Sequence, residues 1–281
     1  MTESKVTHGF ADNNGIKLYY EKRGHGEPLI CVPGGGGDAG FFTNLANYLM
    51  DSFTVITYDR RGYSRSTRPQ ANYFNIHEHV DDIKAVLHEN GYESAHIVGN
   101  SSGAIIALET AVRMPEIIKK LIVHEPPLLL VLSNKKKYLR FMTRTYNIGL
   151  RFGSNLASNW FNFSLSLPFS VFKHIPEDFQ KRMIQYNNND QLVFVELLGI
   201  TSYVPDYNKI INNKVTIYLA SGQRTMKKKK YYGITSPIIA KSLNCPMIVF
   251  PGHHLSFLDQ PEVWGNKLKH TICTVDKQED D

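Results

Sequence analysis

A serine between two glycines is the feature of this sequence that most directly indicates chemistry. Residues 99–103 read Gly-Asn-Ser-Ser-Gly, which places Ser101 in a G-x-S-x-G pattern. An apolar run at 95–98 leads into the pattern, and an apparent helix at 104–113 leads out of it. A sharp strand-to-helix turn with small neighbours exposes a serine hydroxyl at the edge of a sheet. The pattern predicts a nucleophile at Ser101, and a non-catalytic Ser/Gly-rich turn is the alternative.

A serine hydroxyl needs a neighbouring base to become a good nucleophile. Eleven histidines are present, and most are expected to be surface or packing residues. The doublet His253-His254 differs, because it follows an apolar run at 247–250 and the dipeptide Pro251-Gly252 late in the chain. Both histidines are therefore candidates for the base.

Over essentially its whole length the chain resembles the α/β-hydrolase fold family. In that family the last strand is followed by Gly-His and then by a helix led by an acidic residue and a proline. The histidine precedes the acid by five residues and the proline by seven, and Asp259 and Pro261 fit this spacing from His254. The resemblance implies that His254 is the general base, with His253 as the lesser candidate.

Two loops carry the resemblance further. Residues 58–66, Tyr-Asp-Arg-Arg-Gly-Tyr-Ser-Arg-Ser, are similar to the family's D-x-R-G-x-G-x-S loop, with Ser64 in place of one glycine. Val-Pro-Gly-Gly at 32–35 stands where the family usually has His-Gly-x. Pro33 replaces that histidine, but an oxyanion hole uses backbone N–H groups. The resemblance implies that the amides of Gly35 and Ser102 form this hole.

The acidic partner of the histidine is not at its commonest family position. That position follows the predicted strand 215–219, where residues 221–225 read Ser-Gly-Gln-Arg-Thr. No Asp or Glu occurs between residues 206 and 259. Some haloalkane dehalogenases resemble this chain in placing the acid after the preceding strand, where Glu125 stands here. The resemblance implies that Glu125 orients the histidine, and Asp206 is the fallback.

The elements that must position these residues alternate along the chain. A hairpin is expected from residues 8–11 and 16–22, and short apolar runs then alternate with amphipathic stretches, which is typical of a parallel sheet covered by helices. The clearest amphipathic stretch repeats Ile76, Val80, Ile83 and Leu87 on one face. The expected strands are 29–32, 54–57, 96–98, 121–123, 215–219 and 247–250, and the expected helices are 41–50, 76–90, 104–113, 232–243 and 261–270.

The alternation stops after Pro126-Pro127 and resumes near residue 214. The interval is rich in aromatic residues without a strand rhythm, so we predict a mostly helical insertion. The fold class is then α/β: an α/β-hydrolase fold with a mostly parallel central sheet flanked by helices and a helical cap inserted after strand 6. The expected division is a core of 1–126 and 214–275, a cap of 127–213, and a flexible acidic tail of 276–281.

A second fingerprint competes for the glycine-rich loop. Residues 35–40 satisfy G-x-G-x-x-G between a predicted strand and helix, and Asp59 follows near the offset of a ribose-binding acid. This would make the protein a nucleotide-dependent oxidoreductase. The hairpin that precedes the motif and the place of Asp59 in the Asp-x-Arg-Gly loop weigh against it. A non-catalytic ligand-binding protein with the same fold is another alternative.

Composition limits the partners. The three cysteines lie far apart without a CxxC, which gives no support for a metal. The net charge of +6 includes lysine clusters at 135–137 and 227–230, for which solvated surface and contact with an anionic membrane or nucleic acid are the alternatives. No aromatic-interleaved basic stripe accompanies them, so we expect no nucleic acid. Peripheral contact with a membrane surface and a homodimer stay open.

The N-terminus lacks the basic and apolar regions of a signal peptide, and no apolar run approaches the ~20 residues that span a bilayer. We therefore expect a cytoplasmic protein without membrane insertion. The expected activity is hydrolysis of a small-molecule carboxylic ester by a Ser-His-Glu triad through an acyl-enzyme, without a cofactor. The aromatic cap favours a lipophilic group, and a thioester, an amide or a cofactor-free perhydrolase reaction stays open.

Overall fold

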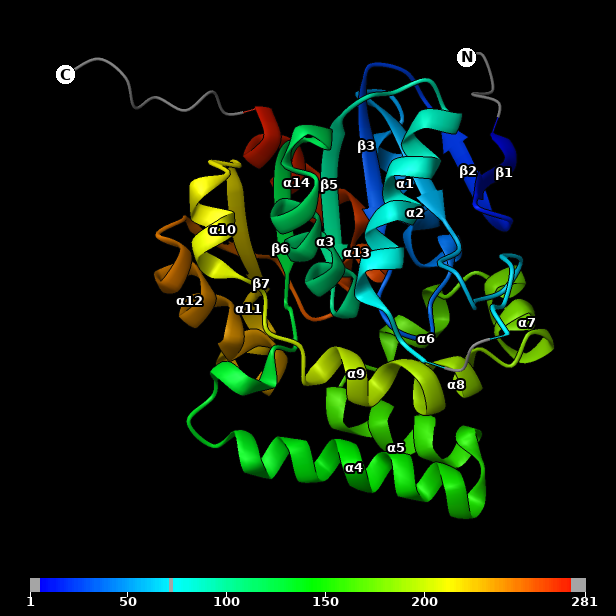
Figure 1. Ribbon diagram of the computed structural model, residues 1–281, viewed down its shortest axis with the longest axis vertical. Coiled ribbons are helices and arrows are strands. Elements are labelled where there is room, and N and C mark those ends of the chain that lie inside the picture. Colours follow the sequence, from blue (N-terminus) through cyan, green and yellow to red (C-terminus); the bar gives the residue numbers. More distant parts are fainter. Residues whose placement is uncertain (1–5, 71–72, 274–281) are drawn as a thin grey trace.

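An eight-stranded sheet forms the middle of the protein (Figure 1). The computed structural model describes residues 6–70 and 73–273. The strands lie in the order β1-β2-β4-β3-β5-β6-β7-β8; the pairs β1–β2 and β2–β4 are antiparallel, and all other neighbours are parallel. The strands are β1 (Thr7–Asn13), β2 (Ile16–Arg23), β3 (Glu27–Val32), β4 (Phe53–Tyr58), β5 (Ala95–Asn100), β6 (Ile118–His124), β7 (Ile217–Gly222) and β8 (Met247–Phe250). The predicted mostly parallel sheet and its N-terminal hairpin are confirmed.

Strand sequences are apolar on both faces because helices cover both sides of the sheet. Along β3, Ile30 and Val32 enter one core cluster, whereas Leu29 and Cys31 enter the other. This two-residue alternation is the normal period of a strand. Helices α2, α3, α10 and α12 contribute to the first cluster, and α1, α13 and α14 contribute to the second.

The helices of the core agree with the sequence pattern. The predicted apolar face of α2 is buried in the first cluster through Ile76, Val80, Ile83 and Leu87. The expected helix at 41–50 is divided into a 3-10 turn, η1 (Ala39–Phe42), and α1. The helices are α1 (Thr43–Leu49), α2 (Ile76–Glu89), α3 (Ser102–Arg113), α10 (Tyr207–Asn212), α11 (Gln223–Lys227), α12 (Tyr231–Leu243), α13 (Ser256–Asp259) and α14 (Pro261–Cys273).

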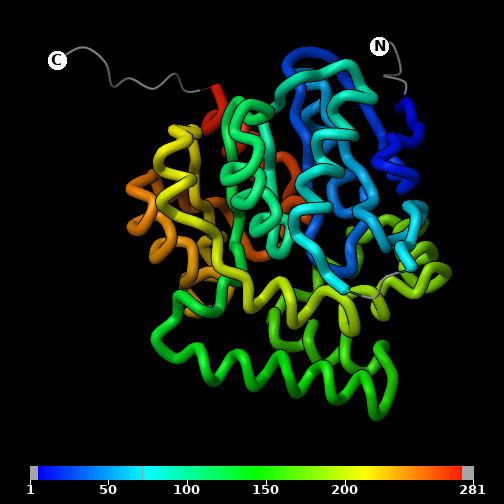
Figure 2. Tube along the Cα trace, viewed as in Figure 1, coloured from blue at the N-terminus to red at the C-terminus, as the bar shows by residue number. Residues whose placement is uncertain are grey.

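Between β6 and β7 the chain forms a helical insertion, which Figures 1 and 2 show below the sheet in green and yellow-green. Helix α10 is not part of this layer, because it packs on α3 and α12 beside the sheet. The elements of the helical insertion are η3 (Leu129–Val131), α4 (Lys135–Phe152), α5 (Ser154–Leu165), α6 (Ser170–His174), α7 (Glu177–Gln185), α8 (Asn188–Asp190), the π-helix η4 (Gln191–Glu196) and α9 (Leu197–Thr201).

The expected domain limits at 127 and 213 remain predictions, and the predicted acidic tail, 276–281, lies outside the described residues. Within the part of the chain that the structure describes, no helix is both long and apolar enough to cross a membrane.

Candidate active site

Ser101 occupies a strained turn between β5 and α3. Its φ of 56° and ψ of −123° are unusual for a residue with a side chain. A Cβ on Gly99 would lie 2.4 Å from the carbonyl oxygen of Gly103, and a Cβ on Gly103 would lie 2.2 Å from that of Val32. The two glycines of the pattern are therefore required by close backbone contacts. They allow the tight turn that holds the Ser101 side chain at the edge of the sheet.

Glu125 and His254 meet at the carboxyl ends of β6 and β8, which are separated in the sheet by β7. Glu125 directly follows β6, and its Oε2 lies 2.5 Å from Nδ1 of His254. The other carboxylate oxygen, Oε1, accepts hydrogen bonds from Oγ of Ser221 at 2.9 Å and from the amide of Gly222 at 2.8 Å. Those two donors are the last residues of β7, beside the position where the family usually carries the acid. Here the end of β7 supports a carboxylate that follows the neighbouring strand β6.

The environment keeps Glu125 ionised. Burial alone would raise its pKa, because a charged group loses hydration. Positive charge on His124 and the hydrogen bonds from His254 and Gly222 outweigh burial and lower the pKa to about 2. Burial also lowers the pKa of His124 to about 4, so its ring is neutral at pH 7. At that pH the hydrogen bonds are therefore the main stabilisation of the Glu125 carboxylate.

The alternative base, His253, and the alternative acid, Asp206, do not take part in the Glu125–His254 contact. Nε2 of His253 lies 3.2 Å from Oδ2 of Asp259, and Oγ of Ser170 donates to the same oxygen at 2.9 Å. Asp259 thus pairs with His253 and not with His254. Asp206 is exposed and accepts from the amide of Lys209 at 3.0 Å as the N-cap of α10.

Asn100 and His124 support the site, and the sequence did not mark them. Nδ2 of Asn100 lies 3.1 Å from the carbonyl oxygen of His254, to which it donates, and 2.9 Å from Nδ1 of His124. The amide of Ser101 donates to the carbonyl oxygen of His124 at 2.9 Å. These hydrogen bonds therefore connect the ends of β5 and β6 with each other and with the loop after β8. In the sequence, only their positions directly before Ser101 and Glu125 could have indicated that Asn100 and His124 lie at the site.

The two expected oxyanion donors line the same pocket as Ser101 and His254. Ser102 is the first residue of α3, and first-turn amides have no acceptor within their own helix. The helix dipole also favours negative charge at this end. Gly35 is closely packed, since a Cβ there would lie 2.6 Å from Cδ1 of Leu192. Both backbone positions are thus near the place where an oxyanion would form.

A buried ion pair joins the helical insertion to the loop that carries Gly35. Nη2 of Arg60 donates to the carbonyl oxygen of Gly34 at 3.1 Å and to Oε2 of Glu196 at 2.9 Å. The Tyr63 hydroxyl donates to the same Glu196 oxygen at 2.5 Å. Burial opposes the charge on Arg60, but the nearby Glu196 outweighs it, and the pKa of the guanidinium is raised. Arg60 therefore remains charged beside residues 34–38, which carry the expected oxyanion donor Gly35 and which we call the oxyanion loop.

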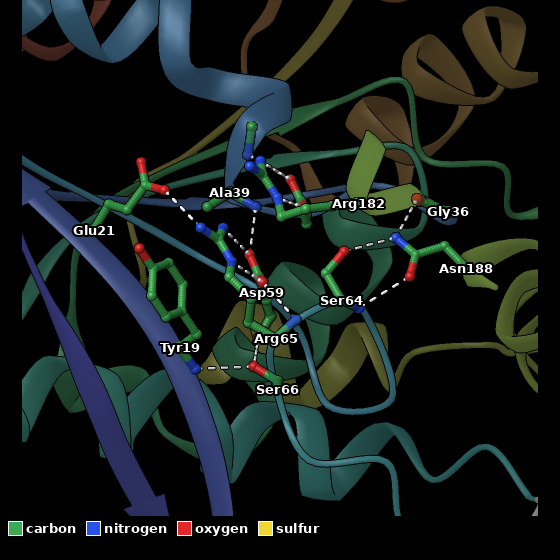
Figure 3. A network of polar contacts seen from close by, with 12 residues as sticks. Tyr19, Glu21, Gly36, Ala39, Asp59, Ser64, Arg65, Ser66, Arg182 and Asn188 are labelled. Carbon is green, nitrogen blue, oxygen red and sulfur yellow. Dashed lines mark hydrogen bonds and ion pairs between the residues drawn. The ribbon is translucent and has the colours of Figure 1, made fainter. Parts of the chain in front are cut away.

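Two further side chains of the helical insertion form hydrogen bonds with this loop, at Gly36 and at Asp38 (Figure 3). Nδ2 of Asn188 donates to the carbonyl oxygen of Gly36 at 3.2 Å and to Oγ of Ser64 at 2.9 Å. Nε of Arg182 donates to Oδ2 of Asp38 at 2.8 Å. With the Arg60–Glu196 pair, these contacts attach the loop 34–38 to α7, α8 and the π-helix η4.

The nucleotide alternative is not supported by the position of Asp59. Its buried carboxylate accepts hydrogen bonds from Nε and Nη2 of Arg65, both at 2.8 Å, and from the amide of Ala39 at 2.9 Å (Figure 3). Burial raises the pKa of Asp59, and the hydrogen bonds with Arg65 oppose that increase. This carboxylate therefore ties the Asp-x-Arg-Gly loop to the glycine-rich loop and is not directed toward a ribose.

The pocket beside Ser101 is mostly apolar. Its one acidic lining residue, Glu196, is already paired with Arg60. Such a surface suits an uncharged, lipophilic group next to the nucleophile. The large apolar side chains that line it are Phe41, Met142, Phe161, Leu165, Leu167, Phe172, Ile175, Phe179, Met183, Leu192, Leu197 and Ile200. Within the described residues, no group of three or more His, Cys, Asp or Glu side chains is arranged to hold a metal ion.

The chain is similar in sequence to known proteins. A family model described as "alpha/beta hydrolase fold" matches residues 27–198, more than half of the chain. A Bacillus subtilis (strain 168) protein, "Uncharacterized hydrolase YraK", is 29% identical over 283 residues, covering 97% of this chain and 98% of that protein.

Solved structures agree on the fold. The protein ALR0039 of Nostoc sp. PCC 7120 superposes with a TM-score of 0.75 at 16% identity, over 96% of this chain and 99% of that one. A thermophilic esterase from Thermogutta terrifontis gives a TM-score of 0.70 at 18% identity, over 96% and 98% of the two chains. At these identities the likeness concerns the arrangement of strands and helices.

Proposed function

The chain belongs to the α/β-hydrolase fold family, and we propose that it is a serine hydrolase that cleaves carboxylic esters. The observation that carries this proposal is the 2.5 Å contact between Glu125 and His254, together with the pocket that His254 and Ser101 both line. A nucleophile, a base and a group that orients the base are the three parts that acyl transfer requires. The hydrolase YraK, which is similar along nearly its whole length, supports the broader class of reaction.

In the proposed first step, the Ser101 hydroxyl attacks the carbonyl carbon of the ester while His254 takes its proton. Because Nδ1 of His254 is engaged by Glu125, Nε2 is the nitrogen that accepts this proton. The ionised Glu125 favours the correct tautomer and stabilises the imidazolium that forms. The charge that develops on the carbonyl oxygen is stabilised by the amides of Gly35 and Ser102, each typically worth about 3 kcal/mol.

Collapse of the tetrahedral intermediate breaks the bond to the alcohol oxygen, which leaves with the proton from His254. The acyl group stays on Ser101 as an ester. Water then attacks this ester while His254 accepts its proton. Collapse of the second intermediate breaks the bond to Ser101, whose oxygen takes the proton back from His254, and the acid product is released. These steps need only protein side chains, backbone amides and water, so the proposal includes no cofactor.

The pocket supports a lipophilic substrate. Phe161, Leu165 and Leu197 line it, and Glu196 is neutralised by Arg60. Burying an apolar acyl or alcohol group there removes about 25 cal/mol of unfavourable hydration per Å². Esters with an uncharged chain of several carbons are therefore the proposed substrate class.

Hydrolysis of p-nitrophenyl acetate, butyrate and octanoate by the wild-type protein and Ser101→Ala tests this proposal. We expect turnover of the wild type with a higher kcat/KM for butyrate or octanoate than for acetate, and none above background for Ser101→Ala. Equal turnover by both proteins would contradict the role of Ser101. A preference for acetate would contradict the lipophilic substrate class.

A further inference from the structure

The helical insertion begins with a stretch of one-sided charge. Residues 127–176 contain seven lysines and arginines and no aspartate or glutamate. The rest of the chain has one more acidic than basic residue, so this stretch accounts for the whole positive net charge. Lysines 135–137 lie in the first turn of α4 and are exposed. Solvated surface segments normally mix both signs of charge, whereas this stretch of sequence carries only positive charge.

Large apolar side chains are exposed in the same stretch. Phe163 is 84% exposed, Phe169 75% and Leu150 64%. Single exposed apolar residues are normal, but a concentration of them marks a binding surface. The remaining exposed members are Phe152, Leu156, Trp160 and Phe172.

Two basic side chains of this stretch lie over aromatic rings of the same stretch. The guanidinium carbon of Arg144 lies 5.4 Å from the ring centroid of Trp160, and Nζ of Lys173 lies 6.0 Å from that of Phe169. Helices α4 and α5 pack on one another and form the end of the molecule farthest from α14 (Figure 1). We call the exposed basic and large apolar side chains of residues 135–174 the basic insertion surface.

We propose that the basic insertion surface binds peripherally to bilayers that contain anionic phospholipids. Aromatic and leucine side chains enter the headgroup region, while lysines and arginines interact with lipid phosphates and with the negative surface potential. Charge argues against a second copy as the occupant, because a two-fold contact would oppose two stretches that each carry seven basic residues and no acidic one. Nucleic acid would leave Leu150 and Leu156 without an apolar environment.

This surface adjoins the pocket. Phe172 is 51% exposed and also lines the pocket, together with the neighbouring Val171. Docking would therefore bring the pocket to the membrane, where lipophilic esters concentrate. This last step rests on the proposed ester hydrolysis, whereas binding to the bilayer does not depend on it.

Flotation with vesicles tests the binding directly. Purified protein is mixed with vesicles of phosphatidylcholine alone, or with 30% phosphatidylglycerol added, at low and at physiological salt. We expect flotation with the anionic vesicles only, weaker at higher salt. Replacing Lys135, Lys136 and Lys137 together with glutamine should lower the partition coefficient between water and the anionic vesicles about 100-fold. Phe163→Asp and Phe169→Asp should each lower it about tenfold or more.

Control variants carry matched changes at other exposed positions. Val263→Asp on α14 and Lys17→Glu on β2 should float like the wild type. Ser101→Ala should also float normally, which separates binding from catalysis. Phe163→Asp and Phe169→Asp should retain hydrolysis of soluble p-nitrophenyl butyrate, since neither residue lines the pocket. Retained turnover would also show that these variants are folded.

The proposal is overturned if the wild type binds neither vesicle, or if it binds both equally. Loss of flotation in the control variants to the same degree would overturn it as well. A concentration-dependent dimer in sedimentation velocity that Phe163→Asp dissociates, without vesicle binding, would identify a second copy as the occupant.

Discussion

Oε2 of Glu125 lies 2.5 Å from Nδ1 of His254, although 129 residues separate them in the chain. The sheet order explains the contact. Glu125 follows β6, His254 follows β8, and β7 lies between these strands. Ser221 and Gly222 at the end of β7 donate to the other oxygen of Glu125. The carboxylate thus reaches across the end of β7 to the histidine that follows β8. Three hydrogen bonds hold it there.

Replacing Glu125 tests its proposed role in the triad. We expect Glu125→Gln to lower kcat about 10⁴-fold, because an amide favours the wrong tautomer of His254 and cannot stabilise its cation. The circular dichroism spectrum should stay unchanged. Asp206→Asn is the matched control, since asparagine also caps helices well and Asp206 is exposed. Near-normal turnover by Glu125→Gln would contradict the assignment.

The two adjacent histidines should respond differently to substitution. His254→Ala is expected to abolish ester hydrolysis. His253→Ala should retain it and lose about 1–3 kcal/mol of unfolding free energy, because buried Asp259 loses a partner. Kinetics and urea unfolding of both variants measure these effects. If His253→Ala is inactive while folded, and His254→Ala is active, the assigned base is wrong.

The contacts of the helical insertion with the oxyanion loop should affect kcat more than KM. Asn188→Ala removes the donor to the carbonyl oxygen of Gly36 and loosens the loop that carries Gly35. Loss of an entire oxyanion donor costs 10²–10³-fold in kcat, so a misplaced donor should cost about tenfold. A trifluoromethyl ketone, which forms an oxyanion on Ser101, should also bind about tenfold more weakly. Lys181→Ala, an exposed change on α7, is the control.

A change in KM alone for Asn188→Ala, with unaltered affinity for the trifluoromethyl ketone, would mean that Asn188 acts on the pocket and not on the oxyanion loop. Glu196→Gln provides a second variant of the same attachment, because it removes the charge that pairs with Arg60. The two variants are expected to shift kcat in the same direction.

Acid should destabilise the protein partly through His124. Burial lowers the folded-state pKa of His124 from 6.5 to about 4, so between these values the unfolded chain binds more protons than the folded one. Stability is therefore complete above the unfolded-state pKa and is lost as the pH falls. Linkage gives a loss of about 2 kcal/mol at pH 5. In urea unfolding at pH 7.5 and 5, His124→Asn should show a correspondingly smaller decrease than the wild type.

Exposed His25 provides the control for that comparison, and His25→Asn should leave the pH dependence unchanged. A His124→Asn variant with the same loss of stability as the wild type would show that His124 is protonated in the folded state at pH 5.

Local sequence was sufficient to predict the elbow and most of the sheet. The glycines at 99 and 103 are needed because a Cβ at either would contact backbone at 2.4 Å or less. The need for glycine at these two positions appears in the sequence as the G-x-S-x-G pattern. The strand β7 was predicted at 215–219 but is Ile217–Gly222. Ala-Ser-Gly at its end has low strand propensity, and pairing with β8 overrides it.

Contacts between distant segments could not be predicted in the same way. Arg60 and Glu196 are 136 residues apart, and Asn188 and Gly36 are 152 apart. Arg60 also stood at the variable position of the Asp-x-Arg-Gly loop, whereas the expected arginine, Arg61, binds Asp82 on α2. Tertiary packing of the helical insertion selects these partners, and no local pattern marks them.

The proposed function depends on Ser101 being an activated nucleophile. Its most direct test is intact-mass spectrometry of the folded wild-type protein and of Ser101→Ala after treatment with a fluorophosphonate probe, which phosphonylates activated serines. We expect one adduct on the wild type and none on Ser101→Ala. No adduct on folded wild-type protein, or an equal adduct on both proteins, would contradict it.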